Sequence, residues 1–333
     1  MTENKTILVF GETTGGRLSP STYELLGAGR SLAKASGHEL AAVLIGSELQ
    51  PAAQEAVSLG VDLVYRVENS SLKDYSAELY LAALEKAVIH TGPEIVLLSQ
   101  TAAGKDLAPG LAFRFNTSAA MDCTALEIDP ASRRLLMTRP VYGGNAQAVQ
   151  VCSTNPQIAA LRRKSFVPAS PESSRQGKVV QIDYAFSPED CKTRLVEHRV
   201  EPATGVKLED ARVVVAGGRG IGSAEGFKQL EELAGILNGA VGATRPPCDR
   251  GWIADTRQIG LTGKIVSPDL YLAIGISGAS QHLSGFSGAK MVVAINKDPE
   301  ANIFRAAHYG IKGDWKIVAP LLSAALKKAV NKT

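Results

Sequence analysis

The order of the apolar runs along this chain constrains its fold more than any other feature of the sequence. Short apolar runs such as 7–10, 40–45 and 95–98 are separated by stretches in which apolar residues recur at helical spacing, such as 21–36 and 76–90. Strands that alternate with helices of this length predict βαβ units and a parallel sheet. We therefore expect residues 1–115 to form an α/β sheet.

The pattern changes twice further along the chain. Residues 119–166 indicate strands and turns, and the polar, proline-bearing stretch 167–174 is typical of a linker or surface loop. Two more strands are expected over 179–184 and 195–200. A second boundary lies near 201–205, and strands alternating with helices return after it.

These patterns predict an α/β protein of two domains. Residues 1–204 are expected to form an N-terminal, mostly parallel α/β sheet with an added β-rich segment, and residues 205–333 a C-terminal Rossmann-like domain. The strands expected in the second domain are Val213–Ala216, Ala240–Ala243, Leu270–Ile274 and Met291–Ile295, followed by a terminal helix over Ala319–Val330.

Charge, aromatic content and cysteine spacing argue against several classes of function. The chain carries 36 Lys and Arg against 33 Asp and Glu, and aromatic residues make up 5% of it, so no nucleic-acid partner is expected. The four cysteines lie at least 29 residues apart without ligand spacing, so no metal site is expected. No signal-like N-terminus or apolar stretch of about 18 residues appears, so we expect no stable membrane insertion and a cytoplasmic location.

Glycine and positive charge gather in the C-terminal part of the chain. Residues 211–313 hold 17 of the 32 glycines, and residues 205–333 carry 16 Lys and Arg against 11 Asp and Glu. Bare backbone N–H groups and positive potential at strand-to-helix loops suit a ligand that bears phosphates. We therefore expect the functional site in this region.

Five loops in this region follow a strand or precede a helix. The first, Gly217–Gly222, is not a clean dinucleotide fingerprint, because Ser223 stands where glycine or alanine is expected and no acidic residue ends the next strand. Arg245, stiffened by the two prolines after it, is suited to hold an anion or lie against a planar ring. His282 follows a glycine-containing turn that resembles a phosphate loop, as a helix begins.

Each of these features also has a purely structural interpretation: a tight turn, a surface arginine, a packed histidine and, for Asp314, a helix cap. Because the five loops are expected at one edge of a parallel sheet, their joint weight favours a binding site. The ligand inferred from the loops is an adenine dinucleotide, and their spacing does not say which one.

Taken together and in this order, the loops resemble the α subunit of electron transfer flavoproteins. The resemblance is carried most specifically by Gln258–Lys264, Pro268–Tyr271, Gly275–Ala279 with Gln281 and His282, and Ala294–Asp298. It covers nearly the whole chain. It implies an FAD-binding C-terminal domain, an N-terminal domain that contacts a β subunit in an obligate heterodimer, and one-electron transfer with partner dehydrogenases, such as the acyl-CoA dehydrogenases of fatty acid β-oxidation.

The resemblance also implies roles for individual residues. Arg245 is expected over the flavin ring, Thr262 at the flavin N5, and His282 near the pyrimidine edge, where negative charge collects on reduction. Phosphates and the chain between the rings are assigned to Arg219, Ser277, Gly278, Ser280 and Gln281, and the adenosine end to Asn296 and Asp314. The other cofactor-binding residues that it implies are Thr244, Gln258, Ile259, Gly260, Leu261, Gly275, Ala279, Lys297 and Trp315.

Three positions depart from the usual family pattern. Leu261 stands where many members carry Gln, which would remove a polar neighbour of the flavin. Ser280 stands where a branched apolar residue is frequent, and Thr244 replaces Ser while keeping the hydroxyl.

Alternatives remain open at this point. One is an electron-bifurcating complex of the same family that oxidises NADH at a second flavin. Another, from a different class, is an NAD(P)-binding dehydrogenase domain, which the broken fingerprint and the missing ribose-binding acid disfavour. A third, an ATP-dependent enzyme, is disfavoured because the chain has no Gly-Lys-Ser/Thr motif.

Overall fold

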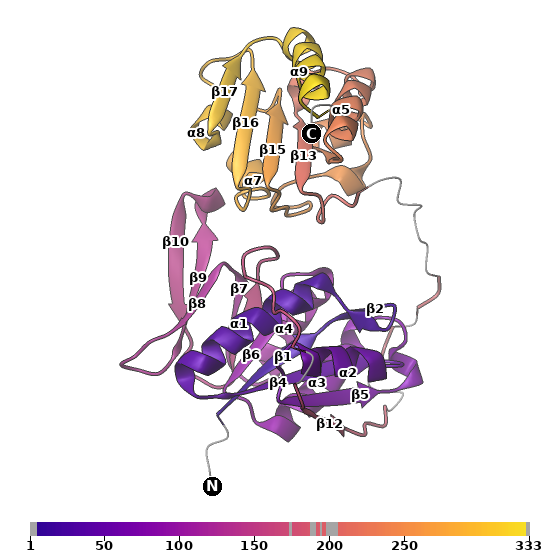
Figure 1. The fold of residues 1–333 in the computed structure, drawn as a ribbon, viewed down its shortest axis with the longest axis vertical. Helices are drawn as coiled ribbons and strands as arrows, with labels where there is room; N and C mark the ends of the chain where they lie inside the picture. Colours follow the sequence, from indigo (N-terminus) through magenta and orange to yellow (C-terminus); the bar gives the residue numbers. More distant parts are fainter. Residues whose placement is uncertain (1–4, 173–174, 187–190, 194, 198–205, 331–333) are drawn as a thin grey trace. The chain divides into compact units, whose positions relative to one another are not determined.

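The computed structural model describes residues 5–172, 175–186, 191–193, 195–197 and 206–330. The chain divides into two compact units (Figure 1). Unit 1 comprises residues 1–140 and 147–199, and unit 2 comprises residues 141–146 and 200–333. The predicted boundary near 201–205 lies outside the described residues.

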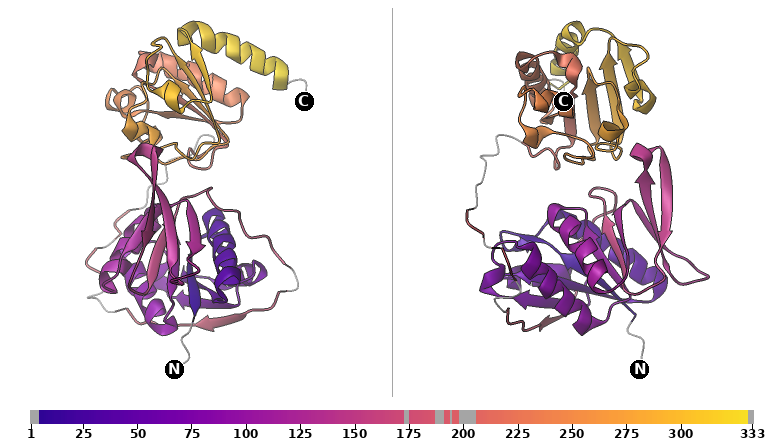
Figure 2. Two further views of the ribbon diagram at one scale, coloured as in Figure 1. Left: turned by 90° about the vertical axis from the view of Figure 1, so that its left-hand side faces the viewer. Right: turned by 180° about the vertical axis from the view of Figure 1, so that it is seen from behind.

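Unit 1 is built on a parallel sheet of seven strands, in the order β12-β5-β4-β1-β6-β11-β7 (Figures 1 and 2). The α/β architecture predicted from the apolar runs is confirmed. The strands of this sheet are β1 (Thr6–Gly11), β4 (Glu39–Gly46), β5 (Leu63–Glu68), β6 (Ile95–Ser99), β7 (Ala119–Cys123), β11 (Gln157–Leu161) and β12 (Lys178–Gln181).

Four helices cover the two faces of this sheet. They are α1 (Pro20–Ser36), α2 (Gln50–Ser58), α3 (Ala77–Thr91) and α4 (Ala102–Arg114). Alternate residues of β1 point to opposite faces, so Ile7 and Val9 pack with α1 and α2, whereas Leu8 and Phe10 pack with α3 and α4. A strand buried on both faces has to be apolar throughout, which is why these runs were recognisable in the sequence.

The added β-rich segment predicted over 119–166 is present as a three-stranded sheet in the order β10-β9-β8. Its strands are β8 (Ala125–Ile128), β9 (Leu135–Val141) and β10 (Ala146–Val151), and the short helix η2 (Tyr142–Gly144) joins the last two. Of the two later strands that were expected, the first is β12, whereas the prediction over 195–200 is wrong for residues 195–197, and 198–200 lie outside the described residues. Two short strands, β2 (Thr13–Thr14) and β3 (Arg17–Leu18), and the 3-10 helix η1 (Ser70–Leu72) also belong to unit 1, whereas η2 belongs to unit 2.

Unit 2 carries a second parallel sheet, in the order β14-β13-β15-β16-β17. Its strands are β13 (Val213–Gly217), β14 (Ala240–Ala243), β15 (Leu270–Ile274), β16 (Met291–Asn296) and β17 (Tyr309–Lys312). The first four match the predicted strands. The chain moves from β13 to β14 on one side and then to β15 on the other, so a topological switch point lies between β13 and β15.

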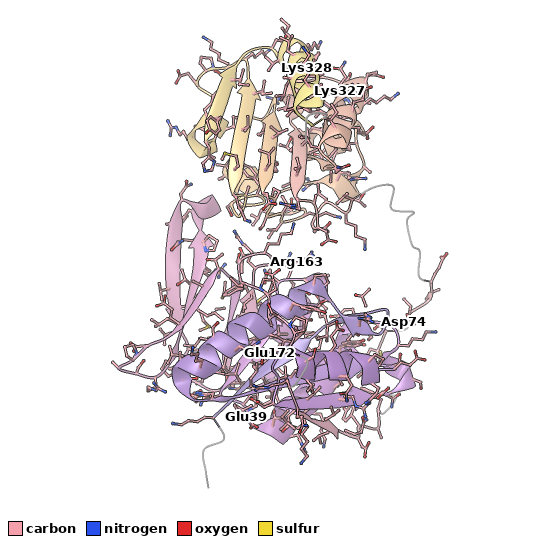
Figure 3. The ribbon with its side chains drawn as sticks, in the orientation of Figure 1. Glu39, Asp74, Arg163, Glu172, Lys327 and Lys328 are labelled. Carbon is pink, nitrogen blue, oxygen red and sulfur yellow. The ribbon has the colours of Figure 1, made fainter. Side chains whose placement is uncertain are left out.

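The helices of unit 2 pack against its sheet and bury two apolar clusters. They are η4 (Arg219–Ile221), α5 (Ala224–Ile236), α6 (Arg245–Asp249), η5 (Asp255–Arg257), α7 (Ser280–Leu283), α8 (Ile303–Ala306) and α9 (Trp315–Val330). The long helices α5 and α9 share one apolar layer against the sheet (Figure 2). Lys327 and Lys328 lie in the last turn of α9 (Figure 3), where the helix dipole favours positive charge.

Ser223, the residue that breaks the dinucleotide fingerprint, has a structural role. It is the N-cap of α5, and its side-chain oxygen accepts a hydrogen bond from the backbone N–H of Gly226 at 3.4 Å. Ser223 therefore departs from the fingerprint but caps the helix that follows the glycine loop.

Candidate functional site

The carboxyl end of the unit 2 sheet brings two glycine loops into direct contact at the switch point. The N–H of Gly218 donates to the carbonyl of Ile274 at 3.0 Å, and the N–H of Gly220 donates to the carbonyl of Gly275 at 3.0 Å. A Cβ at Gly218 would lie 2.8 Å from both Gly275 C and Ile276 Cα, so a side chain at this position does not fit. Glycine is needed here so that the loop after β13 can pack on the loop after β15.

The loop after β15 continues with exposed polar groups. Gly275 and Gly278 both have positive φ, at 62° and 85°, a backbone conformation that favours glycine. Between and after them, Ser277, Ser280 and Gln281 are exposed. Exposed hydroxyls on a glycine loop at a switch point suit the phosphates of a dinucleotide.

Arg245 is the first residue of α6, immediately after β14. It was expected in a rigid loop, and the structure instead shows a short helix that the two prolines begin. Its side chain is 67% exposed, and its one ion pair is with Asp249, 3.4 Å from Nε to Oδ2, with both partners exposed. An exposed pair of this kind contributes little, so the guanidinium is available to a ligand.

Gln258 and Thr262 belong to one loop and contact each other. The Gln258 Nε2 donates to the Thr262 Oγ1 at 2.9 Å. The loop is anchored to the sheet because the N–H of Ile259 donates to the carbonyl of Ala243 at 2.8 Å. Leu261, one of the three departures from the family pattern, exposes 68% of its surface.

His282 is buried and has a protein partner at each ring nitrogen. Its Nδ1 lies 2.9 Å from the carbonyl oxygen of Ile259, and its Nε2 lies 2.9 Å from the hydroxyl of Tyr271. Burial lowers the pKa of His282 to about 4, against a smaller raising effect from the Ile259 carbonyl. The imidazole is therefore neutral at pH 7, and its expected place beside the flavin pyrimidine stays a prediction.

The residues expected at the adenosine end also make protein contacts. Asn296 donates from Nδ2 to the carbonyl of Ile276 at 2.8 Å, which ties the ends of β16 and β15 together. The Asp314 carboxylate accepts from the N–H of Lys316 at 2.9 Å, so its capping role is confirmed. Trp315 is buried, and its indole Nε1 donates to the carbonyl of Gly220 at 3.0 Å. Binding roles for these residues remain predictions.

The remaining candidate residues for cofactor binding are either exposed or engaged in packing and backbone hydrogen bonds. Arg219 and Lys297 are exposed at the carboxyl edge, as is Ala279. Gly260 adopts φ 148°, and a Cβ there would lie 2.9 Å from the carbonyl oxygen of Gln281, so it serves close packing. Thr244 donates its backbone N–H to the carbonyl of Gly217 at 3.0 Å, joining the ends of β14 and β13.

The residues gathered at this edge fit a dinucleotide cofactor. The exposed cations Arg219 and Arg245 suit phosphates or a flavin anion. The exposed hydroxyls of Thr262 and Ser277 can donate hydrogen bonds to the cofactor. The glycines at the switch point allow the loops to pack closely, because a Cβ at Gly218 or Gly278 would meet backbone atoms of a neighbouring segment.

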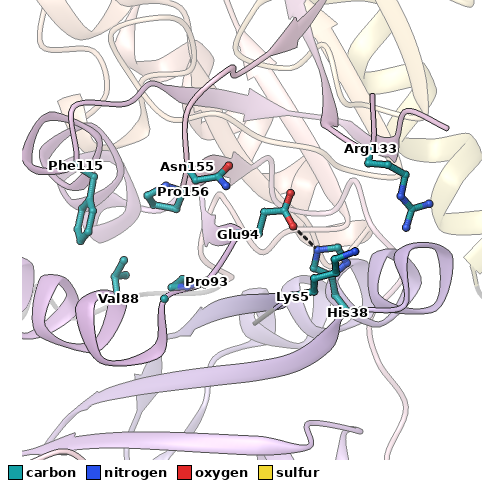
Figure 4. A pocket seen from close by; sticks show the side chains of 10 residues that line it. Lys5, His38, Val88, Pro93, Glu94, Phe115, Arg133, Asn155 and Pro156 are labelled. Carbon is teal, nitrogen blue, oxygen red and sulfur yellow. Dashed lines mark hydrogen bonds and ion pairs between the residues drawn. The ribbon is translucent and has the colours of Figure 1, made fainter. Parts of the chain in front are cut away.

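A pocket of about 490 Å³ in unit 1 contains none of the predicted site residues (Figure 4). In it, the Nε2 of His38 lies 2.8 Å from a carboxylate oxygen of Glu94. Arg133 donates from Nη2 to the carbonyl of Ser36, the last residue of α1, at 2.7 Å. Basic groups are favoured at the carbonyl end of a helix, so the charge here already has a structural explanation.

The described residues offer neither a metal-binding cluster nor a membrane-spanning helix. No cluster of three potential metal-ligating side chains occurs among them. Over the same residues, no helix is both long and apolar enough to span a bilayer.

Comparisons with known proteins identify both halves of the chain. Residues 7–187 match the model of the electron transfer flavoprotein domain, and residues 207–287 match that of the electron transfer flavoprotein FAD-binding domain. The cofactor is therefore FAD, and the NAD(P)-binding alternative is not supported.

Relatives match over nearly the whole chain. An "Electron transfer flavoprotein subunit alpha" of Thermoanaerobacterium thermosaccharolyticum is 42% identical over 98% of this chain and 99% of its own length. The protein of the same name in Bacillus subtilis is 43% identical over 97% of this chain and 98% of its own. "Protein FixB" of Azorhizobium caulinodans is 40% identical over 98% of this chain and 90% of its own. The chain belongs to the electron transfer flavoprotein α-subunit family.

Proposed function

We propose that this chain, in an obligate pair with a β subunit, carries electrons one at a time between an acyl-CoA type dehydrogenase and a further acceptor. The family supports the electron-transfer role, the FAD and the β subunit. The dehydrogenase class and a cytoplasmic location are our extension of it. When bound, FAD supplies the one-electron chemistry, and the chain supplies binding, orientation and charge.

The observation that carries this proposal is the position of Arg245. A permanently charged guanidinium stands at the carboxyl end of β14, next to the switch point, with an exposed side chain and no buried partner among the described residues. A cation fixed beside a redox cofactor stabilises its reduced, negatively charged form and so raises its reduction potential.

The other side chains at this edge have complementary tasks. The Thr262 hydroxyl would donate a hydrogen bond to the flavin ring, and Gln258 holds that hydroxyl in place through the 2.9 Å hydrogen bond. Arg219, Ser277 and Ser280 bind the phosphates. Asn296 orients the loop that follows β15, because its amide already binds the Ile276 carbonyl.

The experiment measures the first reduction potential of the bound FAD in the native pair and in the variants Arg245→Ala and Arg245→Lys. Arg245→Ala should lower the first reduction potential by about 60 mV, which is tenfold in the equilibrium for one electron, and Arg245→Lys should lower it less. The matched control is Arg250→Ala, because Arg250 lies in the same segment but its guanidinium is over Trp252, 5.3 Å from the ring centroid.

A native pair that copurifies without FAD and takes none up would refute the proposed function. An unchanged potential in Arg245→Ala, with FAD bound, would refute only the role of this arginine. Flavin content then addresses the bifurcating alternative, because one FAD per pair is expected of a simple carrier and two of a bifurcating complex.

A further inference from the structure

The loop that carries Gln258 and Thr262 is fastened to the segment around α7 by backbone contacts. The N–H of Leu261 donates to the carbonyl of Gln281 at 2.8 Å, and the N–H of Val266 donates to the carbonyl of Gly285 at 2.7 Å. A Cβ at Gly285 would lie 2.6 Å from Gly260 Cα, so the two backbones are in contact. The conformation of this loop therefore depends on α7.

His282 adds a buried side-chain link between the same two segments. The Ile259 oxygen is a carbonyl and can only accept, so the 2.9 Å contact requires that Nδ1 of His282 carries the proton. The imidazole is neutral, and its Nε2 must then accept, which makes the Tyr271 hydroxyl the donor at 2.9 Å. In the other tautomer, a lone pair on Nδ1 would face the carbonyl oxygen.

Tyr271 lies in the middle of the apolar core, where its hydroxyl needs an explanation. The residue is 0% exposed, on the central strand β15, and its ring stacks on Phe286 with centroids 4.0 Å apart and planes 5° apart. Phenylalanine would supply the same stacking without the cost of burying a hydroxyl. The hydrogen bond to His282 is the one feature of this residue that only tyrosine provides.

We propose that Tyr271 is a positioning residue for FAD binding: its hydroxyl donates to Nε2 of His282 and so stabilises the Nδ1–H tautomer, which donates to the Ile259 carbonyl and holds the 258–264 loop in the conformation that receives the flavin. This proposal rests on the proposed function. Tyr271 is fully buried and does not reach the exposed part of this loop. Its effect on FAD binding passes through the two hydrogen bonds of His282.

The first test reads the tautomer directly. The chain has five histidines, so ¹⁵N labelling of histidine in this full chain alone, combined with unlabelled β subunit, gives five imidazoles to assign by NMR. At pH 7, His282 should show a slowly exchanging proton on Nδ1 and an unprotonated Nε2. A protonated Nε2, in either the other tautomer or an imidazolium, would overturn the proposal. This measurement needs no variant and no FAD.

The second test uses Tyr271→Phe, which keeps the ring and removes only the hydroxyl. The Nδ1 proton should exchange at least about tenfold faster, and the dissociation constant for FAD should rise about tenfold, as for one buried acceptor left unpaired. Tyr309→Phe is the matched control, because Tyr309 is 64% exposed on the edge strand β17 and should keep native FAD affinity.

A general loss of stability has to be separated from positioning. Leu230→Val shortens a fully buried side chain of α5, in the other apolar layer of unit 2, and lowers the melting temperature without touching the loop. Equal weakening of FAD binding in Leu230→Val and Tyr271→Phe at equal melting temperature would overturn the proposal. So would a Tyr271→Phe pair with native FAD affinity. A native pair that binds no FAD would refute the proposed function and this proposal together, whatever the tautomer.

Discussion

Acid should destabilise unit 2 in part through the side chain of His282. Its imidazole is 5% exposed and occupies both nitrogens with Ile259 and Tyr271. Burial lowers its pKa from 6.5 to about 4, although the hydrogen bond to Ile259 partly opposes this shift. The folded chain therefore keeps the imidazole neutral at pH values where the unfolded chain binds a proton.

The sign and size of the effect follow from these two pKa values. Above pH 6.5 both states are neutral, so the contribution of this group to stability is fully present. Each pH unit below that lowers the free energy of unfolding by up to about 1.4 kcal/mol. The loss should approach about 3 kcal/mol as the pH reaches the folded pKa, and should not grow further below it.

Tryptophan fluorescence makes unit 2 visible on its own. The chain has two tryptophans, Trp252 and Trp315, and both belong to unit 2. Urea unfolding followed by this fluorescence, repeated from pH 7.5 downward, gives the free energy of unfolding at each pH. The variant His282→Gln removes the titrating group, so its curve should be flatter than the native curve by about 1 kcal/mol per pH unit in this window.

The slope decides the outcome, because His282→Gln also loses hydrogen bonds and is less stable at every pH. His90→Gln, which changes an exposed histidine of unit 1, is the control and should leave the unit 2 fluorescence transition unchanged. Native and His282→Gln curves of equal slope would show that the imidazole does not titrate as argued.

Three further outcomes are expected from unit 2. Gly218→Ala should destabilise it by about 2–4 kcal/mol and impair FAD uptake, because the new Cβ meets backbone atoms of the neighbouring loop. Gly235→Ala should instead stabilise it by about 0.5–1 kcal/mol, because Gly235 is in a helix and a Cβ there meets no described atom beyond its own helix within 4 Å. A destabilisation of equal size in both, by urea unfolding, would contradict the steric argument. Trp315→Phe loses the hydrogen bond to Gly220 and should cost about 1 kcal/mol and weaken FAD binding; native values for both would contradict a link between α9 and the glycine loop. Asp314→Ala should cost about 1 kcal/mol through loss of the N-cap, which Asp314→Asn should largely restore; equal losses would argue against capping.

Much of the fold was predictable because it depends on patterns among residues that are neighbours in the sequence. Strands buried on both faces, such as Val213–Gly217 and Leu270–Ile274, have to be apolar at every position, so they stand out as runs. The glycines after β13 and β15 also stand out, and in a parallel sheet such loops meet at one edge. By contrast, β17 was missed because all four of its residues are exposed and no apolar run marks it.

Only the tertiary structure decided what the candidate residues do. The glycine loop suggested phosphate contacts, whereas the structure shows that it must also pack against the loop after β15. His282 looked like a group for the cofactor, but its partners, Ile259 and Tyr271, stand 23 and 11 residues away along the chain. Its tautomer and neutral charge follow from those partners and from burial. Local periodicity is a property of neighbouring residues and can be read along the chain, whereas hydrogen-bond partners and burial are set by segments that meet only when the chain folds.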